Sequence, residues 1–364
     1  MNKCLIKSNS IKVFKISYCK GITFSDNCSS NLKELSIYKS EKLAISNKLR
    51  FPNLEKCIFY LYLKDDNIKT SYNYMANYNS SIDFSSFYNL KVLNCEANDF
   101  LMLQNNKTLE SLTILSNDYN NSKEKEKRIF EKIISMKSLK EVKISLKLLN
   151  DDDISKITGD NISVEKLEIY WDKKKQDCIL INLQKKFPNV NNFSLTNCPF
   201  NVCDTNLQIV ENKNCKINKL ALYGINSVVK LYCLPFDNFV EFDLLIFHNK
   251  INGIKDSLPF MNKNCHLTFK SLRSFKFKVN NLEFELLNNI CDNLEKMPNL
   301  KALKLESITP VDKSFYDKLN KKICLLKLND IKIAVYNSAK NLSLMDIKDK
   351  VINLINLDGI IIRK

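Results

Sequence analysis

The side chains that most often carry out chemistry in enzymes are sparse in this sequence. Two histidines, His248 and His266, occur in 364 residues, and the motifs of zinc proteases, nucleophile elbows, phosphate-binding loops and dinucleotide-binding folds are all missing. The one dense cluster of carboxylates is Asp151–Asp153. Because the apolar segment Ile154–Ile157 follows it, we interpret this cluster as charge in the first turn of a helix rather than as a metal or catalytic site. We therefore predict a protein that is not an enzyme and that holds no cofactor or metal.

The thirteen cysteines are scattered singly through the chain, with no C-x-x-C pair. The nearest two are Cys198 and Cys203, whereas a structural zinc site would need paired ligands. An odd, dispersed set is typical of reduced, buried thiols, so we predict a cytoplasmic protein, with nuclear and secreted locations as open alternatives. Residues 1–9 contain no apolar core of a signal peptide, and no apolar run reaches the about 18 residues of a membrane span. Asn-x-Ser/Thr sequons, for example at Asn106 and Asn161, are attributed to the asparagine-rich composition.

The formal net charge of +16 arises from 56 Lys and Arg against 40 Asp and Glu. Nearly all of the basic residues are lysines, and the arginines are Arg50, Arg128, Arg273 and Arg363. Proteins that grip phosphates or read bases usually recruit arginine, because its planar fork bonds in a bidentate manner. Two interpretations remain open, a compositional bias on a solvated surface and a nucleic-acid-binding surface.

A repeated turn followed by a short apolar strand dominates the chain. The clearest copy is Met297–Leu305, in which Met-Pro-Asn precedes leucines at strand positions 1, 4 and 6. In each strong copy an apolar Phe or Met stands three residues before strand position 1, and Asn or Ser stands immediately before it. Roughly one such copy or fewer would arise by chance. The seven strong copies begin at Phe51, Phe87, Met136, Phe187, Phe236, Phe269 and Met297.

These turns place about fourteen strands at an average spacing of about 26 residues. The predicted strand starts are Ile11, Leu32, Leu54, Leu90, Leu109, Leu139, Val164, Val190, Ile217, Phe239, Leu272, Leu300, Ile323 and Ile352. No linker divides the array, so we predict one domain over residues 1–364. Residues 1–10 and 358–364 are predicted to cap its ends, and residues 71–86 to form an irregular insertion.

Two of the longer segments between strands have the apolar periodicity of amphipathic helices. They are Lys123–Ser135 and Asn281–Lys296, and Pro298 follows the second and ends it. Short strands joined by such helices form parallel sheets through right-handed crossovers.

The pattern resembles the leucine-rich-repeat family over about Ile11–Leu357. That family continues with Asn or Cys at position 9, which here holds Cys19, Asn98, Asn117, Cys198 and Asn280, with Asp172 a further candidate. The variable spacing and helical returns resemble its irregular, intracellular, ribonuclease-inhibitor-like branch. The resemblance implies an α/β solenoid, curved as a horseshoe, with a concave parallel β-sheet and helices or irregular segments on the convex side. It also implies an adaptor, substrate receptor or inhibitor that binds a protein.

If positions 1, 4 and 6 face the core, positions 3, 5 and 7 alternate onto the concave face. Position 7 holds four tyrosines there, and lysines occupy position 5 of three C-terminal repeats, with one more at position 7. We therefore predict a protein partner on this face, with a nucleic acid, or a role as a secreted effector, as alternatives. The candidate binding residues are Tyr38, Tyr60, Tyr170, Tyr223, Lys276, Lys278, Lys304 and Lys327.

Overall fold

The computed structural model describes residues 4–6, 10–17, 22–24, 31–38, 43–45, 51–60, 87–95, 97–103, 106–114, 122–146, 148–149, 151–171, 183, 185–196, 216–225, 238–246, 269–279, 288–290, 292–293, 296–307 and 332–337. The candidate residue Lys327, the strand predicted at Ile352, the predicted insertion 71–86 and both histidines lie outside these residues.

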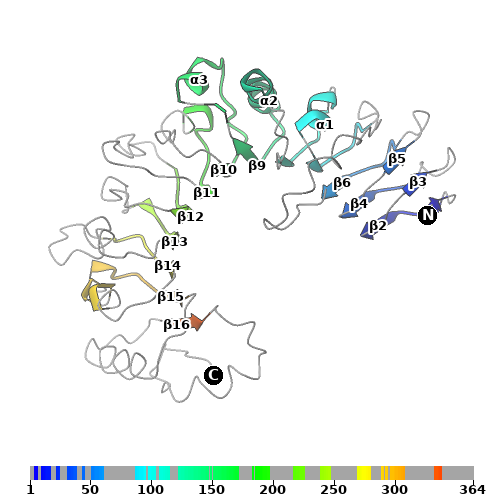
Figure 1. Ribbon diagram of the computed structural model, residues 1–364. Helices are drawn as coiled ribbons and strands as arrows, with labels where there is room; N and C mark the ends of the chain where they lie inside the picture. Colours follow the sequence, from blue (N-terminus) through cyan, green and yellow to red (C-terminus); the bar gives the residue numbers. More distant parts are fainter. Residues whose placement is uncertain are drawn as a thin grey trace, which may run out of the picture. The chain divides into compact units, whose positions relative to one another are not determined.

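Thirteen of the described strands form one long parallel sheet in sequential order, as in a repeat solenoid, which confirms the predicted α/β class (Figure 1). The strands are β2 (Val13–Ser17), β4 (Glu34–Tyr38), β6 (Lys56–Tyr60), β7 (Val92–Cys95), β8 (Ser111–Ile114), β9 (Glu141–Leu146), β10 (Lys166–Trp171), β11 (Asn192–Thr196), β12 (Lys219–Ile225), β13 (Glu241–Ile246), β14 (Ser274–Val279), β15 (Ala302–Ser307) and β16 (Lys332–Asn337). Two compact units are distinguished along the chain. Unit 1 comprises Met1–Leu149 with Ser155–Leu167, and unit 2 comprises Asn150–Ile154 with Glu168–Lys364.

The strand positions predicted from the repeated turn agree closely with the structure. From Ile11 to Leu300, each predicted start lies two residues before the first residue of a strand in this sheet. The agreement has a local cause, because the residues before each strand form a closed turn. Leu54 N–H donates to Phe51 O at 3.2 Å, and Leu300 N–H donates to Met297 O at 3.0 Å. The apolar residue that opens the turn is buried in both copies.

The strand predicted to start at Ile323 lies outside the described residues. The described strand that pairs with β15 is β16, in which Ile333 and Val335 stand beside Leu303 and Leu305. The neighbour of Lys304 on β16 is therefore Ala334 rather than Lys327.

Unit 1 contains a second sheet that the sequence pattern does not predict. It consists of β1 (Cys4–Ile6), β3 (Ile22–Phe24) and β5 (Leu43–Ile45), paired in parallel in that order. The two later strands lie in the short segments that join the first strands of the long sheet. In these segments a short strand links the repeats, whereas the segment between β7 and β8 contains helix α1 (Ala97–Met102).

Three helices are described, α1 (Ala97–Met102), α2 (Lys123–Ser135) and α3 (Asp151–Lys156). The bounds of α2 are those predicted, and Ser122 caps it by accepting a hydrogen bond from Lys125 N–H at 3.1 Å. Its apolar face is buried through Ile129, Phe130, Ile133 and Ile134. Asp151–Asp153 begins α3, which confirms their place in a first helical turn. Of the helix predicted over 281–296, Asn288–Ile290 are described and are helical.

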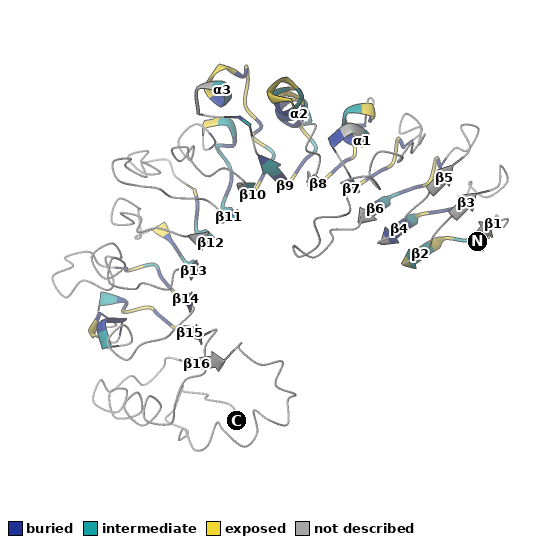
Figure 2. Ribbon diagram, viewed as in Figure 1, coloured by how far each residue is buried: buried dark blue, intermediate teal, exposed yellow. Residues whose placement is uncertain are grey.

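Burial alternates along the strands, and positions 4 and 6 form the core (Figure 2). In unit 1 these positions hold aliphatic residues such as Leu35 and Ile37. In unit 2 they hold stacked phenylalanines, with Phe242 beside Phe275 in register and their ring centroids 5.7 Å apart. Close packing of such rings contributes more than their buried area alone.

Two turns in unit 1 carry a buried asparagine where other turns carry Phe or Met. Asn161 Nδ2 donates to Ile133 O and Met136 O, both at 2.8 Å, and its Oδ1 accepts from Ser163 N–H at 3.0 Å. Asn106 makes the corresponding bonds to the preceding turn, at 2.6 Å to Phe87 O. The side chains are 0% and 8% exposed. Their Asn-x-Ser/Thr sequences therefore reflect turn chemistry that joins successive repeats, which corrects the compositional explanation.

Candidate partner-binding face of the sheet

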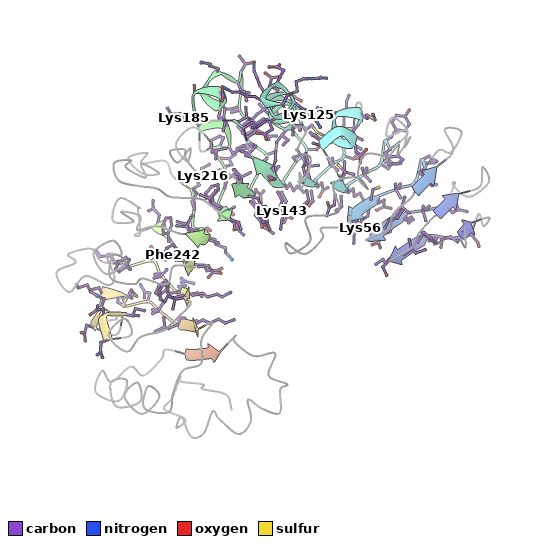
Figure 3. All side chains as sticks on the ribbon, in the orientation of Figure 1. Lys56, Lys125, Lys143, Lys185, Lys216 and Phe242 are labelled. Atoms are coloured by element: carbon purple, nitrogen blue, oxygen red, sulfur yellow. The ribbon has the colours of Figure 1, made fainter. Side chains whose placement is uncertain are left out.

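Positions 3, 5 and 7 of the strands form the face of the long sheet opposite the core residues, here called the open face. In Figure 3, Lys143 of β9 lies on this face, whereas Lys125 projects from α2 on the other side. The strand register decides which candidate residues are neighbours, because partners in a parallel pair have side chains about 5 Å apart.

In unit 2 the register brings two of the predicted lysines together. Lys276 of β14 stands beside Lys304 of β15, and Asp243 of β13 stands on the other side of Lys276. Lys278 is placed beside Glu306. The predicted lysines are therefore bordered by acidic residues, Asp243 at position 5 and Glu306 at position 7, so these strands carry residues of both charges.

The predicted tyrosines are arranged in two places. In unit 1, Tyr38 and Tyr60 are direct partners at the ends of β4 and β6. In unit 2, Tyr170 is the last residue but one of β10 and Tyr223 lies in β12, with Thr196 of β11 as the partner of Tyr223. The residues at position 5 beside them are small, since Ser194 pairs with Ala221.

Part of the open face in unit 1 is shielded, contrary to the expectation of a continuous exposed surface. Ser36 is 0% exposed and Asn94 is 6% exposed, although both occupy position 5. Ser36 stands between Lys15 and Ile58, and Ile58 also borders Asn94. The longer side chains of Lys15 and Ile58 thus flank the shorter ones of Ser36 and Asn94, which contributes to the shielding of Ser36 and Asn94.

Ion pairs join side chains of neighbouring strands near the amino-terminal ends of the strands in unit 1. Lys15 and Lys56 each lie 3.1 Å from Glu34. Burial raises the pKa of Glu34, but hydrogen bonds and charge from these two lysines outweigh burial, so its pKa lies below the ordinary value. The pattern neutralises lysines that would otherwise be available to an anionic partner.

A second row of ion pairs runs one residue earlier in each repeat. Glu55 lies 3.4 Å from Lys33 and 3.1 Å from Lys91, and hydrogen bonds from Lys91 and then Lys33 lower the pKa of Glu55. Such exposed pairs are screened by solvent and contribute little to stability. Their main consequence is electrostatic, because positive and negative side chains alternate along this border of the sheet.

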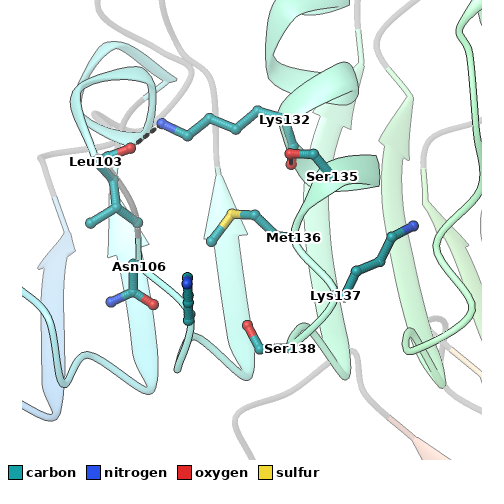
Figure 4. A pocket seen from close by; sticks show the side chains of 8 residues that line it. Leu103, Asn106, Lys132, Ser135, Met136, Lys137 and Ser138 are labelled. Atoms are coloured by element: carbon teal, nitrogen blue, oxygen red, sulfur yellow. Dashed lines mark hydrogen bonds between the residues drawn. The ribbon is translucent and has the colours of Figure 1, made fainter.

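The structure contains a hollow of about 600 Å³ at the helical side of unit 1 (Figure 4). Leu103, Asn106, Lys107, Lys132, Ser135, Met136, Lys137 and Ser138 line it. Lys132 of α2 does not offer a free ammonium group, because its Nζ donates to Phe100 O at 2.7 Å, Leu101 O at 3.0 Å and Leu103 O. These are carbonyls at the carboxyl end of α1, so Lys132 caps that helix. Its Nζ also lies 4.9 Å from the centre of the Phe100 ring.

Burial lowers the pKa of Lys132 to about 8, and the charge of Arg128 acts in the same direction. Below pH 8 the ammonium is charged in both folded and unfolded chains, so the cost of its burial is fully present. Between about pH 8 and the ordinary lysine value of 10.5, the folded state releases the proton first. The contribution of this group to unfolding free energy should therefore increase across that window.

We expect Lys132→Met to remove that pH dependence. Urea unfolding of the native protein and of Lys132→Met at pH 7, 8.5 and 10 measures this dependence. Lys137→Met is the matched control, because Lys137 lines the same hollow. We expect the free energy of unfolding of the native protein to increase relative to that of Lys132→Met as the pH rises. A difference that stays constant with pH would contradict the lowered pKa.

The sequence did not single out Lys132, and it marked Asn106 and Asn161 only as sequons, because the roles of all three depend on contacts between repeats. Among the described residues, no group of three or more His, Cys, Asp and Glu side chains could hold a metal ion. The thiol of Cys57 is fully buried, and burial, with the nearby charge of Asp99, raises its pKa well above the ordinary value, so it is a poor nucleophile at neutral pH.

The described helices include none long and apolar enough to cross a membrane. No protein-family model matches the chain, and no curated protein matches it either.

Proposed function

We propose that this protein is a non-enzymatic, cytoplasmic scaffold that binds a protein partner on the open face of unit 2. The observation that supports the proposal is the strand order and register of unit 2, in which Asp243, Lys276 and Lys304 are neighbours. Tyr170 lies in β10 and Tyr223 in β12, two strands apart, with the small residues Ser194 and Ala221 at position 5 of β11 and β12. Tyrosines in such settings commonly supply about 2 kcal/mol or more of binding energy each.

Mixed charge favours a folded protein over a nucleic acid as the partner. Asp243, Lys276 and Lys304 follow one another at position 5, so an approaching phosphate backbone would meet a carboxylate beside the lysines. Complementary charges on a protein partner could instead fix the orientation of the complex. The resemblance to leucine-rich-repeat proteins of the intracellular type supports the same role, as adaptor, substrate receptor or inhibitor.

The test is affinity capture with the double variant Tyr170→Ala/Tyr223→Ala, compared with the native chain at low and high salt. We expect the variant to lose at least about tenfold of the captured protein, because both aromatic anchors are removed. Tyr88→Ala is the matched control, since Tyr88 is 62% exposed in a turn of unit 1. Circular dichroism confirms that each variant is folded.

Two outcomes would contradict this assignment. Undiminished capture by the double variant would exclude these tyrosines as the binding site. Capture of RNA or DNA that disappears at high salt, and that requires Lys276 and Lys304, would favour the nucleic-acid alternative.

A further inference from the structure

Strand β2 is the last strand in the order of the long sheet, so one of its edges pairs with β4 and the other faces away from it (Figure 1). Its apolar residues are less protected than those of the next repeat. Phe14 and Ile16 are only half-buried, whereas Leu35 and Ile37 at the same positions are 0% and 1% exposed. Among the described strands none lies beyond β2 in this sheet, so β2 receives from them no cover like that which each later repeat has from its predecessor.

Backbone donors on this side of β2 are also unused. Inside unit 1, the N–H groups of strand positions 2 and 3 both donate to the preceding repeat, as Lys33 N–H and Glu34 N–H do to Lys12 O at 2.7 and 3.1 Å. By the same geometry the N–H groups of Lys12 and Val13 point away from β4. Among the described residues neither has a partner, and Val13 is 53% exposed. Unpaired strand edges of this kind are templates for an added strand.

The charges beside this edge select the kind of strand that fits. Glu55 is bracketed by a lysine from the repeat on each side, Lys33 and Lys91. Lys12 occupies the same position in the first repeat, but its neighbour there is Lys33, and within the described part of the chain its ammonium meets no carboxylate. A glutamate or aspartate on a strand added beyond β2 would give Lys12 an acidic neighbour, as Glu55 is for Lys33 and Lys91.

We propose that β2 accepts an extended acidic segment of a partner protein as an added parallel strand. The segment has apolar residues at positions 1, 4 and 6, which cover Phe14 and Ile16, and a carboxylate at position 2 next to Lys12. Its carbonyls accept hydrogen bonds from Lys12 and Val13. This edge belongs to unit 1, whereas the tyrosines of the proposed open-face site belong to unit 2.

A second copy of this chain fits the edge poorly. Two β2 strands related by a two-fold axis would lie antiparallel and would bring Lys12 and Lys15 of each copy together across the contact. Lysines on edge strands commonly prevent such pairing. The same lysines that repel another copy attract an acidic strand.

The test uses the full chain and a fluorescein-labelled peptide, Asn-Leu-Glu-Thr-Leu-Glu-Ile-Thr, in a fluorescence anisotropy titration. The control peptide has lysine in place of both glutamates. Val13→Pro removes an outward-facing N–H without touching the bonds to β4, and proline is tolerated on strand edges. We expect Val13→Pro and Lys12→Glu each to weaken binding of the acidic peptide by about tenfold or more. Lys270→Glu, an exposed lysine of unit 2, should leave binding unchanged.

Three results would overturn the proposal. Equal affinity for the acidic peptide and for its lysine control would show that charge does not select the added strand. Undiminished binding of the acidic peptide by Lys12→Glu would show that the peptide does not bind beside β2. This variant still tests the proposal if Val13→Pro does not fold. A dimer in sedimentation velocity that Val13→Pro dissociates would identify a second copy as the occupant. Tyr170→Ala/Tyr223→Ala should bind the peptide normally, so failure here and failure of the open-face proposal are distinguishable.

Discussion

Phe275→Ala is expected to lower the free energy of unfolding of unit 2 by about 3–5 kcal/mol. The side chain is 1% exposed in β14, and its ring lies 5.7 Å from that of Phe242 and 6.2 Å from that of Phe277. Truncation removes the shared neighbour of both rings and leaves a cavity between adjacent strands. Because a solenoid is held together by contacts between neighbouring repeats, the loss falls on the interface of β13 and β14.

Urea unfolding followed by tryptophan fluorescence measures this effect, since the one tryptophan, Trp171, ends β10 in unit 2. Phe275→Leu is the milder variant and should cost no more than about 1.5 kcal/mol, so it remains informative if Phe275→Ala does not fold. Hydrogen exchange in β13 and β15 locates the change. A loss below about 1 kcal/mol for Phe275→Ala would show that the stacked rings are not what stabilises these repeats.

The long sheet could be predicted because its signal is local. A closed turn with a buried Phe or Met fixes where each strand begins, and the spacing of apolar residues fixes which face is buried. Helix α2 was predictable for the same reason, since thirteen residues suffice to show a helical period.

Features that depend on neighbouring repeats could not be predicted. The strands β1, β3 and β5 are three residues long, which is too short to show a period. Glu55 is 22 residues from Lys33 and 36 from Lys91, so their ion pairs become visible only once the register is known. The candidate tyrosines and lysines were chosen from strand position alone, and their role in binding stays a prediction. The acidic neighbours of the lysines, Asp243 and Glu306, follow from the register.

Asn161→Ala is expected to destabilise unit 1 by about 2–4 kcal/mol. The substitution removes two donated hydrogen bonds and one accepted bond from a site with 0% exposure. It leaves Met136 O and Ser163 N–H without this partner, and each buried polar group that becomes unsatisfied costs about 1–3 kcal/mol. Hydrogen exchange at Ser163 and over the end of α2, together with urea unfolding followed by circular dichroism, measures the loss.

Asn89→Ala is the matched control, because Asn89 is exposed and makes one bond between turns, to Pro52 O at 2.7 Å. It should cost about 1 kcal/mol or less. Asn161→Met separates two explanations, since methionine is the residue that opens the turn at Met136. If the hydrogen bonds hold the repeats together, Asn161→Met is as damaging as Asn161→Ala, because an apolar side chain cannot satisfy the carbonyls of the preceding turn. A stable Asn161→Met would mean that filling the turn is sufficient, and that the asparagine is an interchangeable alternative to Phe or Met.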